Sequence, residues 1–413
     1  MLKTNAVLAG GALLAAILAL PQTSVAQPGG AQPGGVQPGG APPGGGRGGP
    51  PGGGGPGAAA TGIPAADNPF TTTVVQDLEQ PWAMEFLPDG RLLVTDRRGE
   101  LKLISRDGAS VGNITGVPAV SYGGQGGFGD LVLHPQYATN NLVYMSYAEP
   151  GDTTRGAAVA RARLVLDSSG GGRLENPQVL WRAEPKVSSS AHFGHRIAFP
   201  PDGFMYISSG ERAQGTPAQD MTQTLGKIVR LTLDGAIPPD NPFVAQGGVT
   251  AQIWSLGHRN PLGLTFDRSG QLWNVEMGAM GGDEINRVVK GSNYGWPVVS
   301  NGQNYGGGDI PDHVTRPEFK APAISWVPSI SPGGMIFYYG NAFPDWQGDA
   351  LVAGLSSQSL IRVELDGETG REVGRYGMGA RIRGVEQAPD GTLYLIEDAG
   401  RGSPGRLLRI TPK

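Results

Sequence analysis

Between Trp82 and Asp398 the chain repeats one pattern of apolar and polar residues six times. Each copy contains an apolar segment, a turn with Gly, Asp or Pro, and a second segment that is almost continuously apolar. Short apolar runs between turn residues are typical of strands that are covered on both faces. The copies read WAMEFLPDGRLLVTD, GDLVLHPQYATNNLVYMSYAE, HRIAFPPDGFMYISSGE, PLGLTFDRSGQLWNVE, GGMIFYYGNAFPDWQGDALVAG and RGVEQAPDGTLYLIED.

A third apolar segment follows each pair, for example in residues 99–105 and 226–235, and no stretch of comparable length has helical periodicity. The pattern therefore predicts an all-β fold. Units that stack around an axis and bury both faces form a β-propeller, and the repeat sets the number of units. We predict a six-bladed β-propeller over residues 68–413, in which residues 71–75 pair with residues 407–410 and close the last blade.

The region before the repeat has two parts. Lys3 precedes an apolar run over residues 6–20, and a Ser-Val-Ala sequence ends at Ala26, so residues 1–26 are typical of a secretory signal peptide. Residues 27–67 are rich in Gly and Pro and predict a disordered linker, because they hold too little apolar surface to offset the entropy of ordering. We expect a periplasmic or secreted protein with no membrane span after signal cleavage.

Charge and composition exclude several functions. The formal net charge is only −4 and no basic face is evident, which argues against a nucleic-acid partner. The chain has no cysteine, so disulfides and thiolate catalysis are excluded. The Gly-rich segments GQGGFG and GAMGG do not open a helix after a strand, so they do not predict a nucleotide site.

Unusual polar residues recur at two points of the repeat, before the first segment and after the second. These two points lie at the same end of an antiparallel hairpin, so in a propeller the side chains would meet at one mouth of the channel and form a ligand site. Those before a first segment are Gln125, His192, Arg259, Asn260, Ser329, Ser331, Arg381 and Arg383, and those after a second are Glu211 and Gly278.

Some of these residues also have a structural interpretation. A turn histidine is more often a hydrogen-bonding residue than a base; the position of His192 favours function, whereas His195 could be structural. Arg259 could bond turn carbonyls instead of a ligand, and its sequence context favours neither role. Gln125 and Asn260 lie in turns, where bonds to local backbone are common.

Arg381 and Arg383 alternate along a predicted strand and so point to the same side of it. A pair of guanidinium groups suits a planar or carboxylate ligand, but an ion pair at a blade edge would use the same residues.

A set of motifs identifies a family resemblance. In order, the chain contains QPWAMEFLPDG, GQGG, HFGHR, LGKIVRLTLDGAIPPDNPF, GHRNPLGL, GGDEIN and GSNYGWP. This set resembles the soluble quinoprotein family of glucose and sorbosone dehydrogenases, especially the bacterial aldose sugar dehydrogenases, over essentially all of the chain after the linker. The resemblance implies a six-bladed propeller that binds pyrroloquinoline quinone (PQQ) over a calcium ion. It also implies oxidation of an aldose at the anomeric carbon by hydride transfer, with an external electron acceptor.

The resemblance further implies roles for individual residues. His192 would be the general base, with Glu211 assisting it. Arg259 would stabilise charge on the reduced quinone, with Asn260 beside it. Gln125 would contact the cofactor or the sugar, and Arg381 and Arg383 would bind carboxylates of the quinone. The backbone carbonyls of Gly278 and Ala279 would ligate calcium together with cofactor atoms.

The chain departs from the family's pattern in three motifs, at four positions that would all surround the quinone. His195 stands where a glycine is usual, and Met277 and Ala279 replace a His or Gln and a Pro around Gly278. Ser356 stands where a cofactor-binding lysine is expected.

Two other functions therefore stay open. One is a calcium-dependent propeller hydrolase, such as a lactonase, that uses His192 and Glu211 to activate water; Asp283 would be a further candidate ligand for its metal. The other is a non-catalytic propeller that binds a glycan or protein in a degenerate cofactor pocket.

Overall fold

The computed structural model describes residues 67–200 and 203–413, so the predicted signal peptide, and the predicted linker apart from Asp67, lie outside the described residues. Within these ranges the fold is all-β, as predicted, and the only α-helix is the single turn α1 (Tyr137–Asn140). No helix in these ranges is long and apolar enough to cross a bilayer. Short 3-10 turns are η1 (Thr216–Gln219), η2 (Val244–Gln246), η3 (Gly248–Gln252), η4 (His313–Thr315) and η5 (Pro344–Trp346).

The strands form five sheets; four are antiparallel throughout, and the fifth has eight strands and is mixed. This large sheet joins two four-strand meanders through a parallel pairing of β5 with β9. Its strands are β2 (Pro81–Phe86), β3 (Leu92–Asp96), β4 (Glu100–Ile104), β5 (Val111–Thr115), β6 (Phe128–Leu133), β7 (Leu142–Pro150), β8 (Arg155–Leu166) and β9 (Gly172–Arg182).

The other four sheets have four strands each. In chain order they contain β10 (Gly194–Ala198), β11 (Phe204–Ser209), β12 (Lys227–Thr232) and β13 (Ile253–Leu256); β14 (Pro261–Phe266), β15 (Leu272–Glu276), β16 (Asp283–Arg287) and β17 (Ile324–Trp326); β18 (Pro332–Phe337), β19 (Ala350–Gly354), β20 (Ser359–Asp366) and β21 (Thr369–Gly377); and β22 (Ile382–Gln387), β23 (Leu393–Glu397), β24 (Arg406–Pro412) and β1 (Phe70–Asp77).

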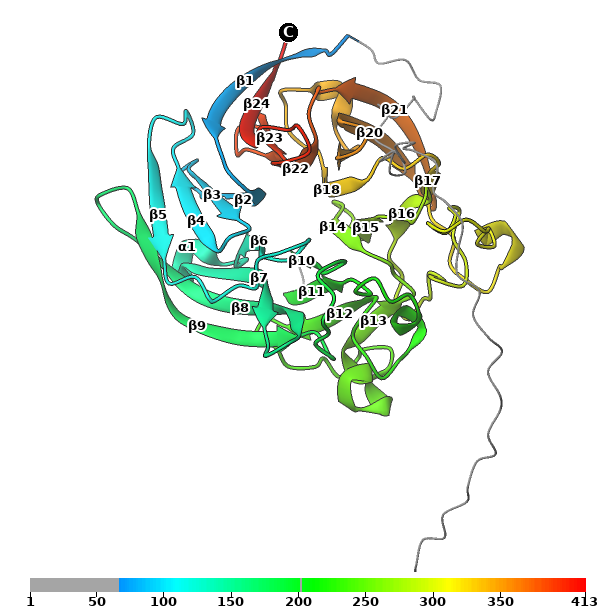
Figure 1. Cartoon of the computed structure of the whole chain (residues 1–413). Coiled ribbons are helices and arrows are strands. Elements are labelled where there is room, and N and C mark those ends of the chain that lie inside the picture. Colours follow the sequence, from blue (N-terminus) through cyan, green and yellow to red (C-terminus); the bar gives the residue numbers. More distant parts are fainter. Residues whose placement is uncertain (1–66, 201–202) are drawn as a thin grey trace, which may run out of the picture. The chain divides into compact units, whose positions relative to one another are not determined.

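The first strand of each meander faces a common axis (Figure 1). These strands contact one another in the order β2, β6, β10, β14, β18, β22 and back to β2. The hydrophobic core is correspondingly divided into clusters between neighbouring meanders; one packs Leu93 of β3 against Val143 of β7, and another packs Tyr394 of β23 against Val94 of β3. Burial on both faces explains why the inner strands are almost continuously apolar.

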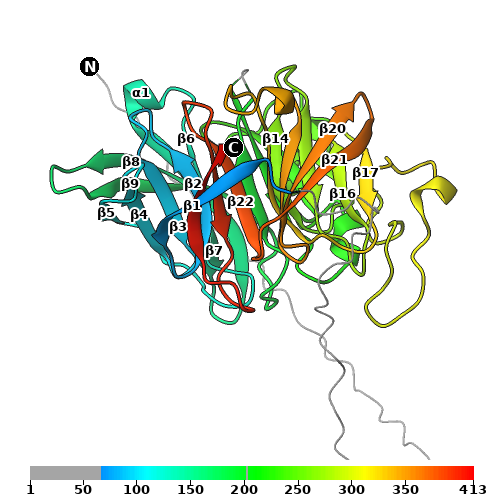
Figure 2. The same cartoon turned by 90° about the horizontal axis from the view of Figure 1, so that it is seen from above.

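The N-terminal strand β1 pairs with β24, with Thr72 opposite Ile410 and Val74 opposite Leu408. The predicted pairing of residues 71–75 with residues 407–410 is therefore confirmed, and Figures 1 and 2 show β1 lying beside β24. Because the last meander is completed by the start of the domain, the two ends of the ring are joined by main-chain hydrogen bonds.

Each first strand has a register shift near its beginning, for example between Gly194 and Ile197 in β10 and between Ile382 and Gly384 in β22. A β-bulge leaves one residue out of the ladder and redirects the neighbouring side chain, and such bulges are common beside active sites. Here they occur where the sequence analysis placed the candidate polar residues.

Candidate functional site

A cavity of about 730 Å³ opens at the beginnings of the first strands, and its size is usual for a small-molecule pocket. We call it the mouth cavity; its lining includes Arg97, Gln125, His195, Met277, Ser356 and Arg383. Of the predicted site residues, Gln125, Ala279, Arg381 and Arg383 line it directly. His192, Glu211, Arg259, Asn260 and Gly278 lie behind this lining and are connected to it by the hydrogen bonds described below.

His192 and Glu211 form the hydrogen-bonded pair that the sequence analysis expected. The His192 Nδ1 atom meets Glu211 Oε1, and the other carboxylate oxygen accepts from the backbone amides of Gln214 and Gly215. Burial opposes ionisation of Glu211, but the bonds to His192 and to the amides outweigh it and lower the pKa of the carboxyl. An ionised Glu211 accepts a hydrogen bond from the Nδ1–H group, so Nε2 is the basic atom of the neutral His192 ring.

Gln125 and Asn260 hold the backbone around His192. Gln125 Oε1 accepts a hydrogen bond of 2.8 Å from the His192 amide, and Asn260 Oδ1 accepts one of 3.1 Å from the Gly194 amide. His192 itself has a positive φ of 48°, a conformation that costs energy and persists only when its surroundings impose it. Both side chains therefore bond backbone amides, but of a loop 67 and 66 residues away along the chain and not of their own turns, so the prediction of local bonds is wrong. These bonds orient His192.

Arg259 is bonded into the same network. Its amide donates to Glu276 Oε2 at 2.6 Å, and its carbonyl accepts from the Glu211 amide at 2.9 Å. Its guanidinium donates to the carbonyl oxygens of Met277 and Gly278, so the carbonyl-bonding interpretation holds. Arg259 Nε is buried without a hydrogen-bond partner, as is Asn260 Nδ2. Buried polar atoms without a partner are uncommon in folded proteins and are often found at functional sites.

Arg381 and Arg383 lie side by side on the wall of the mouth cavity. Arg381 Nε donates to Asp398 Oδ2 at 3.0 Å, and Arg383 donates to Asp398 Oδ1 from two nitrogens at 3.0 and 2.7 Å. Burial opposes ionisation of Asp398, but the two arginines outweigh it and lower its pKa. Arg381 and Arg383 therefore form ion pairs with Asp398 and also line the mouth cavity.

The sequence analysis missed Arg97 and Arg401, which also line the mouth cavity. Arg97 directly follows the second strand of its meander, β3, the same point of the repeat that singled out Glu211 and Gly278. Position in the repeat was therefore the signal that could have found it.

His195 fits because Gly129 has no side chain. A Cβ atom on Gly129 would lie 2.0 Å from Cε1 of the imidazole. The His195 ring stacks on Trp82 with centroids 5.0 Å apart, and its Nδ1 is 2.9 Å from Ser146 Oγ. Burial, with a further contribution from Arg196, lowers the pKa of His195 to about 3. The ring is therefore a neutral part of the cavity floor.

The other departures leave the wall without the expected lysine. Ser356 lines the mouth cavity, and its hydroxyl donates to the carbonyl oxygen of Ser329 at 3.1 Å. Met277 adds an apolar surface to the lining. Neither residue contributes charge, so the basic character of the cavity comes from its arginines.

The donors available for calcium are main-chain oxygens. Among the described residues, no three His, Asp or Glu side chains are grouped so that they could hold a metal ion. Asp283, a candidate for the hydrolase function, instead accepts from the Gly278 amide at 2.8 Å, from Ser329 Oγ at 2.6 Å and from the Ser331 amide at 2.7 Å. It braces the loop that carries the Gly278 and Ala279 carbonyls, and calcium accepts such oxygen ligands readily.

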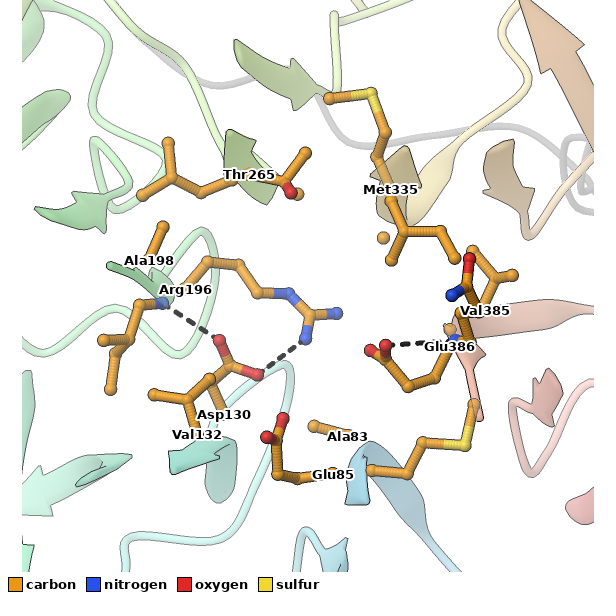
Figure 3. Close-up of a pocket in the computed structure, with 18 of the residues that line it drawn as sticks. Ala83, Glu85, Asp130, Val132, Arg196, Ala198, Thr265, Met335, Val385 and Glu386 are labelled. Atoms are coloured by element: carbon orange, nitrogen blue, oxygen red, sulfur yellow. Dashed lines mark hydrogen bonds and ion pairs between the residues drawn. The ribbon is translucent and has the colours of Figure 1, made fainter. Parts of the chain in front are cut away.

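A second cavity, of about 440 Å³, lies further along the axis and is lined by residues of all the first strands, β2, β6, β10, β14, β18 and β22 (Figure 3). We call it the axial cavity; it contains Glu85, Asp130, Arg196 and Glu386. Asp130 accepts from the Arg196 guanidinium and from the Ile197 amide, both at 2.9 Å. Trp82 lines both cavities, and the Arg196 guanidinium lies 4.0 Å from the centroid of its ring.

A closed ring of sheets around an axis defines a propeller-type protein, and this one has a basic cavity at its mouth, backed by a His–Glu pair. The model of the Glucose / Sorbosone dehydrogenase family matches residues 78–409, and the chain belongs to this family.

Similar proteins agree with this membership. The chain is 40% identical over 359 residues to aldose sugar dehydrogenase YliI of Escherichia coli strain K12, covering 84% of this chain and 95% of that protein. The apo-form crystal structure of the soluble aldose sugar dehydrogenase from Escherichia coli matches with 39% identity and a TM-score of 0.76, over 83% of this chain and all of that one. The PQQ-bound aldose sugar dehydrogenase of Streptomyces coelicolor matches with 28% identity and a TM-score of 0.67, over 85% and 99%.

Proposed function

We propose that the protein is a PQQ-dependent dehydrogenase that oxidises aldose sugars at the anomeric carbon. The observation that carries the proposal is the His192–Glu211 pair, bonded through the main chain to Arg259 beside a cavity lined by guanidinium groups. We interpret the five sheets as a six-bladed propeller, in which each half of the eight-stranded sheet is one blade.

His192 has the surroundings of a general base. Its Nδ1 proton is held by an ionised Glu211, so Nε2 can accept the proton of the anomeric hydroxyl group. Gln125 and Asn260 fix the main chain on either side of the ring. Bound PQQ would supply the two-electron acceptor for the hydride, and an external acceptor would then reoxidise it.

Arg259, Arg381 and Arg383 supply fixed positive charge to the same site. A guanidinium group cannot lose its proton near neutral pH, so it stabilises negative charge throughout a reaction cycle. Arg381 and Arg383 would bind carboxylates of the quinone, and Arg259 would face its reducible oxygen.

Calcium would be held by the carbonyl oxygens of Gly278 and Ala279 together with atoms of the cofactor. In this structure the Gly278 carbonyl accepts from the Arg259 guanidinium. A calcium ion at that oxygen would therefore compete with the guanidinium for the Gly278 carbonyl.

We further infer that the protein works in the periplasm or outside the cell. This inference depends on the signal-peptide pattern of residues 1–26.

The test is reconstitution of the quinone-free protein with PQQ and calcium, followed by reduction of a dye with aldoses as substrates. His192→Ala should lower kcat by about 100- to 10,000-fold, whereas His134→Gln, in the loop after β6, should leave kcat unchanged. Failure to bind PQQ at micromolar concentration would refute the proposal. Lactone hydrolysis with calcium alone would indicate the hydrolase, and sugar binding without dye reduction would indicate a binding protein.

A further inference from the structure

The mouth cavity has an unusual surplus of positive charge. Its lining contains four guanidinium groups, those of Arg97, Arg381, Arg383 and Arg401, and the one acidic side chain among its described lining residues is Asp398. Four positive charges and one negative charge leave a formal excess of three. An excess of this size favours a ligand with more than one negative charge.

The arginines differ in their partners. Asp398 is shared by Arg381 and Arg383. Arg97 has no carboxylate within ion-pair distance among the described residues, although it is half-buried. One of its terminal nitrogens donates to the carbonyl oxygens of Gly124 and Gly126. Its Nε and its other terminal nitrogen make no hydrogen bond within the described part of the chain, so they remain available to a ligand.

Arg97 also lies near the arginine pair. Burial lowers its pKa, and the charge of Arg383 lowers it further, which places the two guanidinium groups within electrostatic reach of each other. Asp398 also lies within electrostatic reach of Arg97, but it already pairs with Arg381 and Arg383, so repulsion between like charges on this wall remains. An anionic ligand would relieve this repulsion.

The position where the family's pattern has a lysine bears on the charge of this cavity. Ser356 stands there, and its hydroxyl is turned to the Ser329 carbonyl. The wall therefore lacks the ammonium charge that the family's pattern would place on it, while a guanidinium without an acidic partner lines the same cavity.

We propose that Arg97, together with Arg383, binds a carboxylate of the anionic cofactor and replaces the positive charge that Ser356 does not provide. This inference rests on the proposed function. Arg97 also donates to the carbonyl oxygens on both sides of Gln125. Gln125 in turn accepts from the His192 amide, so the Arg97 guanidinium connects the wall of the mouth cavity to the loop that orients His192.

The experiment is an absorbance titration of the quinone-free, full-length protein with PQQ and, separately, with its trimethyl ester, which lacks the negative charges. Arg97→Gln should raise the Kd for PQQ by about 10- to 100-fold and leave the Kd for the ester nearly unchanged. Adding Ser356→Lys to Arg97→Gln should restore most of the affinity for PQQ. Arg91→Gln, which removes an exposed arginine paired with Asp89, is the matched control and should bind both ligands as the wild type does.

The outcomes separate the two proposals. Wild-type protein that binds no PQQ would refute the proposed function, and the inference with it. Wild-type binding combined with an unchanged Kd for Arg97→Gln would overturn the inference alone. Equal weakening of PQQ and ester would also overturn it, because Arg97 would then only support the Gly124–Gly126 loop.

Discussion

The mouth cavity and the axial cavity share Trp82 but carry opposite charge. Arginines dominate the mouth, whereas the axial cavity has three carboxyl groups, on Glu85, Asp130 and Glu386, and one guanidinium group. Burial acts differently on the two kinds of group, since a carboxyl group can bind a proton and become neutral but a guanidinium stays charged.

The carboxyl groups of the axial cavity show this response. Burial raises the pKa of Glu386 to about 7 and raises that of Glu85 well above its usual value, and the neighbouring carboxylates add to both effects. The axial cavity can therefore lower its negative charge by binding protons, whereas the mouth keeps a positive charge that only an anion can balance. This difference supports the proposal that the mouth is the ligand site, whereas the axial cavity has the charge of an internal polar cluster of the ring.

The largest expected effect is on the axial ion pair. Arg196→Met leaves Asp130 buried without its partner, and we expect it to lower the free energy of unfolding by about 3–5 kcal/mol. Urea denaturation measures this loss. Asp130→Asn in the same chain should recover part of it, and if the single variant were as stable as wild type, the pair would not hold the first strands together.

Glu386→Gln should change the pH dependence of stability. The pKa of Glu386 is 4.5 when unconstrained and about 7 in the fold, so its folded state binds the extra proton. Its contribution is full below about pH 4.5 and is lost as the pH rises through 7, a change of at most about 3 kcal/mol. Unfolding of wild type and variant between pH 4.5 and 8 checks this. The wild type should lose more stability over that interval, and equal slopes would contradict the prediction.

The stability of the fold should be sensitive to side-chain volume where Gly129 packs against His195. Gly129→Ala places a methyl group against the His195 ring, and we expect a loss of about 1–3 kcal/mol in the free energy of unfolding. The double variant Gly129→Ala, His195→Gly removes the clash and should be less affected by the added methyl group. Thermal or urea unfolding of the four related proteins isolates the coupling between the two positions.

The smallest effect is expected from one arginine of the mouth. Arg381→Gln leaves Asp398 paired with Arg383, so stability should change little. The Kd for PQQ should rise about tenfold, as expected for one charge-assisted hydrogen bond. A matching loss of stability would show that Arg381 serves the blade edge and not the ligand.

The inner strands could be predicted from the sequence, whereas the outer strands could not, apart from β1. β3 and β23 are buried throughout and β11 in all but its first residue, so their apolar runs are plain in the sequence. β5, with the sequence VGNIT, buries only Ile114 and carries no comparable pattern. The fourth strands of the first five meanders were missed for this reason, since outer strands lie partly in solvent.

The residues of the candidate site could be predicted from their position in the repeat, but their contacts could not. Its polar residues were found because the repeat places them at the same end of each hairpin. Their hydrogen bonds, such as Asn260 to the Gly194 amide, depend on distances between loops that are far apart along the chain.

The sequence by itself determined the repeat, the all-β architecture and the end of the ring that carries polar chemistry, because each depends on local patterns of apolar residues and turns. Only the tertiary structure decided which charges are shared and which are free. Arg97 and Arg383 belong to the first and last meanders, and they line one cavity only because the ring closes. No local pattern records that Arg383 shares Asp398 while Arg97 has no ion pair within the described residues.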